Sequence, residues 1–329
     1  MNTEAIKQQS NAAYKQWAEQ WRAHAREHSK FKQPTFEKFE NIGVGRAVLC
    51  VANGYSFEEE IETIKLHQDK VDIMACDKTL GNLIDNGVTP TYCMVCDANV
   101  DAEKYLEKWK DKLSGTTLFI NVCANPEWTK RGNWKEVVFF SNRDVIDSHL
   151  EFAKLSGCPN FIPAGTNVSN AMVILLTQSD NEGRQNVFGY DKILLIGFDY
   201  SWRFDGKYYA FDEDAGGKAN YMRHVYTVTP NGNFCYTSGN LTFSMDWLKT
   251  YINAFKLPVV QCSADSLLAL GGKAAKLSEQ MQYSFKPEDR GPVKSAVKEL
   301  REIKKRELEL LTKINSIGRD HYWASYRSF

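Results

Sequence analysis

Three apolar segments in the first hundred residues end at polar residues that are suited to bind an activated phosphate compound. The first ends at Asn53-Gly54, the second at Asp77 and the third at Asp97. A glycine turn lets a phosphate or a ribose approach the backbone, because glycine has no Cβ. Asp77 is suited to accept from a ribose hydroxyl or a base amine. Asp97 is suited to hold a divalent cation or to orient a nucleophile.

Two later segments repeat this pattern. Gly165-Thr166-Asn167 stands just before a predicted helix, which is the arrangement of a phosphate-binding loop. Asp199 follows the apolar run KILLIGF and supplies another carboxylate. Each feature alone is common in structural turns, since aspartate often caps a helix and glycine often forms a turn. Together they predict a nucleotide or activated-sugar site.

Two hydroxyl residues follow the first two turns and complete the predicted nucleotide-binding set. Ser56 is expected to cap a helix over residues 57–67, with Glu59 as its partner in a capping box. Thr79 is expected to cap the helix that follows Asp77.

A regular alternation of strands and helices must position these turns. It predicts right-handed crossovers and a Rossmann-like α/β fold, with a mostly parallel sheet and helices on both faces. Ligands of such sheets bind at the carboxyl ends of the strands, so the polar turns should line one crevice. The predicted strands are 46–52, 71–75, 92–96, 117–122, 136–140, 161–162, the KILLIGFD segment and 258–262, and the predicted helices are 57–67, 80–86, 102–113, 143–155, 171–178 and 243–255.

Three regions are expected along the chain. Residues 1–40 form a helical segment, with an amphipathic helix over 4–28 that packs on the main domain. Residues 41–284 form the transferase domain, with a Tyr- and Gly-rich lid insertion at about 200–242. Residues 285–329 form a charged helical arm, which either mediates homo-oligomer contacts or packs back on its own domain.

Bulk composition limits the classes of partner. The 41 basic and 41 acidic residues balance, so no global field attracts nucleic acid or an anionic membrane. No apolar stretch is long enough for a transmembrane segment, and the charged N-terminus is unlike a signal peptide, so a cytoplasmic location is expected.

The eight cysteines are expected to be reduced core thiols. Cys93 and Cys96 should point to opposite faces of one strand, which argues against a shared zinc ion. His24 and His28 share a helix face but lack a third ligand.

At these positions the sequence resembles a known superfamily. It comprises the archaeal hydroxymethylpterin pyrophosphokinase (MptE)-like domain, the motility accessory factor flagellin glycosyltransferases and, more distantly, the bacterial CMP-sialic-acid-dependent sialyltransferases. The resemblance spans roughly residues 48–270. It is carried by VANGYS, ACDKTLGNLIDNGVTPTYCMVCDAN, PAGTNVSNAM and LLIGFDYS, and by the sialyltransferase-like segments YYAFD and CSADSLLA.

The resemblance implies a Rossmann-like transferase whose nucleotide contacts Asn53, Gly54, Asp77, Gly165 and Thr166. Tyr209 matches a family tyrosine that contacts the donor phosphate.

Two positions depart from the sialyltransferase pattern. Asp77 and Asp97 replace asparagines of those enzymes, and an aspartate favours a cation such as Mg²⁺ or Mn²⁺. The sialyltransferase histidine base should fall near residues 236–238, where no histidine stands. His224, about a dozen residues earlier, or Asp97 is then the candidate base.

The leading hypothesis is a glycosyltransferase that uses a CMP- or UDP-type nucleotide sugar, with Asp97, His224 and Tyr209 as catalytic candidates. Its acceptor is a glycan, a protein or a nucleic acid. The lid tyrosines, Tyr208, Tyr209, Tyr226 and Tyr236, either cover a sugar or aromatic acceptor or anchor the loop in the core. The sequence contains no GxGxxG and no P-loop motif, which argues against a typical dinucleotide or P-loop enzyme.

Two alternatives remain open at this point. The first is diphosphate transfer from ATP to a hydroxymethyl group, with Mg²⁺ at Asp97 and Asp199. The second is a non-catalytic module that binds a partner through the arm from Lys286 onward. In that arm a basic run at 304–306 with nearby aromatic residues suggests nucleic-acid contact, but interleaved glutamates favour a solvated helix face.

Overall fold

The computed structural model describes residues 3–143, 148–163, 166–178, 187–211 and 225–282, and six helical positions between 299 and 310. The chain divides into two units, Met1–Ser284 and Phe285–Phe329. Most of the predicted arm therefore lies outside the described residues. Of the predicted site residues, Gly165 and His224 also lie outside them. No helix among the described residues is long and apolar enough to cross a membrane.

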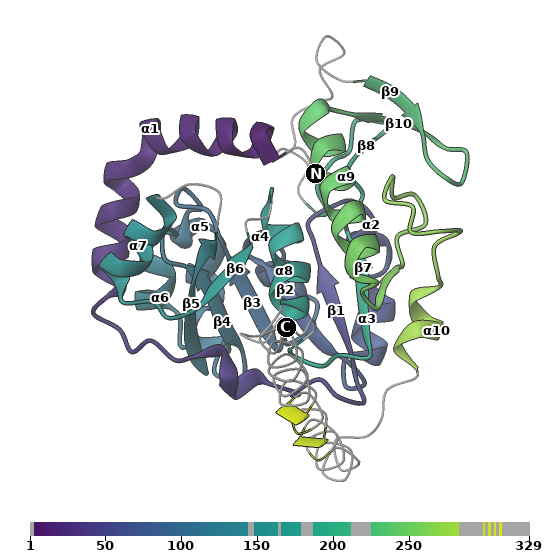
Figure 1. The fold of residues 1–329 in the computed structure, drawn as a ribbon. Helices are drawn as coiled ribbons and strands as arrows, with labels where there is room; N and C mark the ends of the chain where they lie inside the picture. The colour runs from purple at the N-terminus through teal and green to yellow at the C-terminus, as the bar shows by residue number, and fades with distance from the viewer. Residues whose placement is uncertain are drawn as a thin grey trace, which may run out of the picture. The chain divides into compact units, whose positions relative to one another are not determined.

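The larger unit is built on a sheet in which every paired neighbour is parallel, as the sequence predicts (Figure 1). Its strands lie in the order β11-β7-β1-β2-β3-β4-β5-β6. The chain winds outward from β1 to β6 and then returns through β7 to the other side of β1, so the helices that follow β1 and β7 cover opposite faces of the sheet. In such sheets, ligands bind at the carboxyl edge where the winding reverses. The strands are β1 (Ala47–Val51), β2 (Asp72–Cys76), β3 (Tyr92–Val95), β4 (Thr117–Asn121), β5 (Glu136–Arg143), β6 (Phe161–Pro163), β7 (Lys192–Ile196) and β11 (Val259–Gln261).

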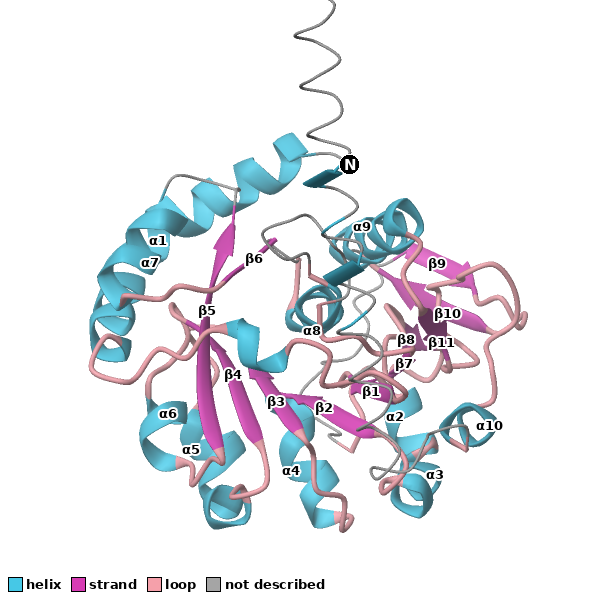
Figure 2. Ribbon diagram, turned by 60° about the horizontal axis from the view of Figure 1, so that its bottom comes forward, coloured by secondary structure: helices cyan, strands magenta, loops and turns pink. Residues whose placement is uncertain are grey.

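Helices cover both faces of this sheet (Figure 2). Along β1, Leu49 and Val51 belong to the buried cluster under α3, α4 and α5, whereas Val48 and Cys50 belong to the cluster under α8 and α9. This alternation confirms the Rossmann-like class. The helices are α1 (Thr3–His28), η1 (Phe36–Phe39), α2 (Ser56–Glu59), α3 (Ile61–His67), α4 (Asp77–Asp85), α5 (Ala102–Leu106), η2 (Glu107–Lys112), α6 (Glu127–Arg131), α7 (Ser148–Ser156), α8 (Val168–Thr177), α9 (Gly239–Phe255) and α10 (Leu277–Met281).

The cysteines behave as the strand pattern predicts. Cys93 packs in the cluster under α4, and Cys96 packs against the cluster under α8, so their side chains lie on opposite faces of the sheet. All eight cysteines are free thiols.

Some local predictions were wrong. The capping box at Ser56 does not form, because Tyr55 occupies the N-cap position and the predicted helix is interrupted at Glu60. The helix after β2 begins already at Asp77.

The described part of the lid insertion contains a small antiparallel sheet, whose strands are β8 (Trp202–Arg203), β10 (Phe234–Thr237) and β9 (Val225–Val228).

The N-terminal helix packs on the main domain as predicted, and its two histidines contact backbone carbonyls. His24 Nδ1 lies 2.9 Å from the carbonyl oxygen of Cys123, and His28 Nδ1 lies 3.0 Å from that of Val122. Burial lowers the pKa of His28 to about 4. Both histidines therefore anchor α1.

Candidate functional site

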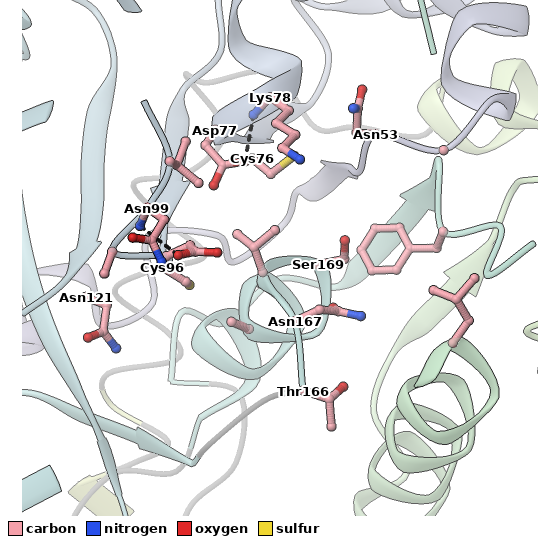
Figure 3. Close-up of a pocket in the computed structure, with 18 of the residues that line it drawn as sticks. Asn53, Cys76, Asp77, Lys78, Cys96, Asn99, Asn121, Thr166, Asn167 and Ser169 are labelled. Carbon is pink, nitrogen blue, oxygen red and sulfur yellow. Dashed lines mark hydrogen bonds between the residues drawn. The ribbon is translucent and has the colours of Figure 1, made fainter. Parts of the chain in front are cut away.

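A cavity of about 620 Å³ lies at the carboxyl edge of the sheet (Figure 3). It is lined by the turns after β1, β2, β3 and β7 and by the first turns of α4 and α8. The structure thus brings these turns together, and their role in binding stays a prediction. The predicted site residues that line the cavity are Asn53, Gly54, Asp77, Asp97, Thr166, Asn167, Asp199 and Tyr209.

Two predicted residues lie behind the rim. Ser56 is 3% exposed and Thr79 is 0% exposed, and neither lines the cavity. Thr79 Oγ1 accepts from the Cys76 backbone N–H (3.0 Å) and donates to the Val51 carbonyl (3.1 Å), which ties the start of α4 to β1. We therefore assign both residues to the support of the rim, in place of the predicted contact with a nucleotide.

Two glycines let the turns after β1 and β7 approach each other. The Gly54 amide donates to the Gly197 carbonyl at 3.0 Å. A Cβ on Gly54 would lie 2.3 Å from Asp199 Oδ2, and a Cβ on Gly197 would lie 2.0 Å from the Ala52 carbonyl oxygen. The absence of a side chain at Gly54, which the sequence suggested would admit a phosphate, is thus needed by the protein's own packing.

Asp199 joins β7 to α2 at this crossing. Its Oδ1 accepts from Ser56 Oγ at 2.6 Å, and its Oδ2 accepts from the Ser56 amide at 2.9 Å. The residue is 1% exposed, and burial raises its pKa to about 6. Because Ser56 occupies both carboxylate oxygens, Asp199 serves primarily to fix the shape of the rim.

Asp77 and Asp97 form a carboxylate pair at the ends of β2 and β3. Asp77 is 3% exposed, and its pKa is raised to about 6 by burial and, to a smaller extent, by the nearby charge of Asp97. Asp97 is exposed, and its Oδ1 accepts from the Asn99 amide at 2.8 Å. No group of three or more metal-binding side chains occurs in the part of the chain that the structure describes. Two carboxylates suit a Mg²⁺ ion that takes its other ligands from phosphates and water.

Lys78 is a cation at the site that the sequence analysis did not single out. It lines the cavity directly after Asp77, and its ammonium group lies 4.8 Å from the centre of the Tyr209 ring. Asn53 and Lys78 also line a second cavity of about 190 Å³. The position of Lys78, beside a strand-end aspartate at the start of a helix, is the sequence signal that could have identified this residue.

Asn53 offers an acceptor to a ligand. Its Oδ1 is buried and has no hydrogen-bond partner in the described structure. The backbone beside it is fixed, because the Asn53 carbonyl accepts from Ala210 (3.2 Å) and Gly54 pairs with Tyr209 in an isolated bridge. A ligand hydroxyl or amine would satisfy the buried oxygen.

The lid tyrosines divide into two groups. Tyr208 and Tyr209 line the cavity, and their rings lie 4.4 Å apart. Tyr226 and Tyr236 lie on β9 and β10, where Tyr226 stacks on Phe234 at 5.1 Å, and neither lines the cavity. Two of the four therefore fit the predicted ligand-facing role, and the other two belong to the small sheet.

Asp77→Asn should stabilise the protein at neutral pH. A carboxyl whose pKa rises from 3.8 to about 6 on folding favours the folded state most at low pH, and this contribution is lost as the pH rises through about 6. The variant lacks this titration, so we expect it to equal wild type near about pH 4 and to exceed it by about 2 to 3 kcal/mol near about pH 7.5. Urea unfolding at both pH values measures the difference. An equal difference at the two values would contradict the assignment.

Comparison with known proteins places the fold. A family model described as 6-hydroxymethylpterin diphosphokinase MptE-like matches residues 22–205, which is more than half of the chain. The structure is similar to that of the MAf glycosyltransferase from Magnetospirillum magneticum AMB-1, with a TM-score of 0.51 and 16% identity over 84% of this chain and 42% of that one. The chain thus spans less than half of that protein, and the likeness shows a shared fold alone. A search of curated proteins found no match. The family match confirms the resemblance drawn from the strand-end motifs: the chain belongs to the MptE-like family.

Proposed function

We propose that this protein is a transferase that binds a nucleotide-activated donor in the 620 Å³ cavity and transfers a sugar from it. One observation carries the proposal. The first turns of α4 and α8 and the side chain of Lys78 line one cavity, together with the turns after β1 and β7, between which the winding of the sheet reverses. Helix N-termini and an ammonium group both attract phosphate, so the donor's phosphates would lie between them.

The first turn of α8 is prepared for such a ligand. Asn167 caps the helix by accepting from the Asn170 amide at 2.8 Å. Thr166, Asn167 and Ser169 line the cavity (Figure 3), and so does Val168. Backbone N–H groups at the start of a helix are fixed before the reaction. They therefore stabilise the negative charge that develops on the departing nucleotide.

Asp97 is the described residue best placed to act as the base. It is exposed and lines the cavity, whereas Asp199 is bonded through both carboxylate oxygens to Ser56. A base must reach the acceptor hydroxyl, which requires access to the cavity. Tyr209, under the Lys78 ammonium, would contact the donor phosphate. In a metal-dependent reaction Asp97 would instead join Asp77 in holding Mg²⁺ or Mn²⁺, which would offset phosphate charge.

Diphosphate transfer from ATP is the second candidate, and the Asp77–Asp97 pair favours it. Both aspartates line the cavity just beyond the ends of the neighbouring strands β2 and β3, and phosphoryl transfer relies on carboxylate-held Mg²⁺ that bridges phosphates. The matching family is also named after a diphosphate transfer, that of 6-hydroxymethylpterin diphosphokinase.

Calorimetric titration with CMP-sugars, UDP-sugars and ATP, each with and without Mg²⁺ or Mn²⁺, tests the proposal. We expect saturable binding of a nucleotide sugar and release of its nucleotide when a glycan or protein acceptor is added. ATP turnover to AMP with a hydroxymethylpterin acceptor would establish the second candidate instead. Absence of saturable heat with every nucleotide would overturn both.

A further inference from the structure

One face of the N-terminal helix forms a wall of the cavity. Ala13, Trp17 and Trp21 are four residues apart, so they lie on the same side of α1, and all three line the cavity. They precede residue 22, where the family match begins. This wall is therefore supplied by a part of the chain that the family model does not include.

The wall is held rigidly in place. Trp21 packs edge-on against Phe152, with ring centres 5.7 Å apart. Arg22 Nε donates to Glu151 Oε1 at 2.6 Å. These contacts fix Trp21, and hence the position of Trp17 one turn earlier on the helix.

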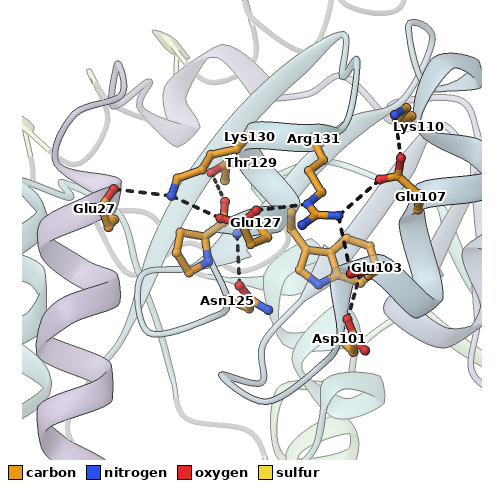
Figure 4. A network of polar contacts seen from close by, with 12 residues as sticks. Glu27, Asp101, Glu103, Glu107, Lys110, Asn125, Glu127, Thr129, Lys130 and Arg131 are labelled. Atoms are coloured by element: carbon orange, nitrogen blue, oxygen red, sulfur yellow. Dashed lines mark hydrogen bonds and ion pairs between the residues drawn. The ribbon is translucent and has the colours of Figure 1, made fainter.

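Further contacts fasten α1 at the Trp21 end of the wall and beyond it. Gln20 Nε2 donates to Asn99 Oδ1 at 3.2 Å, which joins the helix to the turn that carries Asp97. Towards the helix C-terminus, Lys130 lies 3.5 Å from Glu27 and 3.2 Å from Glu127 (Figure 4). Little ordering would then be needed when a ligand binds.

Polar side chains from β4 and β5 line the same cavity. Asn121, Ser141 and Asn142 stand at or near the ends of these strands. Asn121 Oδ1 accepts from the Cys123 amide at 2.9 Å, and its Nδ2 lies 3.4 Å from Asn142 Oδ1. A flat indole surface together with carboxamide donors and acceptors suits a planar heteroaromatic ring that carries polar groups at its edge.

We infer that Trp17, supported by Trp21, forms the subsite for the nucleobase of the donor, while the donor's phosphates lie at Lys78. The inference rests on the proposed function and extends it, because it assigns the two ends of the ligand to different walls. It also makes Trp17 a determinant of how tightly a nucleotide binds. An indole stacks on any base, so selection among bases falls to the carboxamides of Asn121 and Asn142.

Calorimetry with Trp17→Ala tests this, using CDP, UDP and ADP as nucleotide probes and inorganic diphosphate as a probe without a base. We expect the variant to bind the preferred nucleoside diphosphate about tenfold more weakly and inorganic diphosphate with unchanged affinity. Trp17→Phe should keep most of the affinity, because it retains a stacking ring. Lys15→Ala, an exposed position on the same helix, is the matched control and should bind both probes as wild type does. Circular dichroism checks that each variant is folded.

Four results would overturn the inference. Unchanged nucleotide affinity in Trp17→Ala would show that the base binds elsewhere. An equal loss for nucleotide and inorganic diphosphate would show a general disturbance of the cavity. If wild-type protein bound inorganic diphosphate as tightly as nucleotides, the proposed base subsite would be refuted. The proposed phosphate site would be unaffected by that result. Wild-type protein that binds neither probe would refute the proposed function together with the subsite.

Discussion

Lys78→Ala is expected to lower kcat/KM for the donor about 100-fold or more. The Lys78 ammonium lines the cavity between the start of α4 and the Tyr209 ring. A charged hydrogen-bonding group that points at phosphate oxygens contributes most when negative charge develops on the leaving nucleotide. Loss of one such group typically lowers the rate by a factor of about 10² to 10³. Steady-state kinetics with the donor identified by calorimetry measures the effect.

Two variants serve as controls for this experiment. Lys78→Arg keeps the charge and should recover part of the activity, although its planar fork differs in shape. Lys108→Ala removes an exposed lysine that pairs with Asp85 at 2.7 Å outside the cavity, and it should leave kcat/KM unchanged. An active Lys78→Ala enzyme with a wild-type kcat/KM would show that the donor phosphates lie away from α4.

Gly197→Ala should destabilise the fold by about 2 to 5 kcal/mol, a large part of the roughly 5 to 15 kcal/mol that holds a typical domain. Gly197 has φ +74°, and an added Cβ would lie 2.0 Å from the Ala52 carbonyl oxygen. The left-handed backbone costs about 1 to 2 kcal/mol for an L-residue, and the overlap adds about 1 to 3 kcal/mol. The turns after β1 and β7 would separate, so the rim of the cavity would lose its shape.

Gly206→Ala is the matched control for the backbone term. Gly206 has φ +91° and no atom within 4 Å of an added Cβ, so the substitution should cost only about 1 to 2 kcal/mol. Denaturant unfolding of both variants separates strain from overlap. Equal destabilisation of the two would contradict the close packing between β1 and β7.

The strands and the edge where the site lies could be predicted from sequence because both follow from local pattern. Continuous apolar runs mark strands that are buried on both faces, and β1 and β7 are such runs. A polar residue directly after each run must lie at the carboxyl end. Asp77 and Asp97, which follow two other apolar runs, are therefore identifiable from the sequence alone.

The roles of individual side chains at the rim could not be predicted from the sequence, because these roles depend on which turns meet in the folded protein. Ser56 was expected to cap its own helix, but Asp199, 143 residues later in the chain, accepts its hydroxyl and its amide. Sequence periodicity contains no information on that pairing. The same holds for Trp17, since a helical pattern shows that α1 has an aromatic face but not which cavity that face covers.

The most direct test of the central claim is a crystal structure of the protein with a bound nucleoside diphosphate. We predict phosphate oxygens within hydrogen-bond distance of Lys78 Nζ and of backbone amides in the first turn of α4 or α8. Nucleotide density outside the cavity lined by Asn53, Asp77, Asp97 and Asn167 would contradict the account.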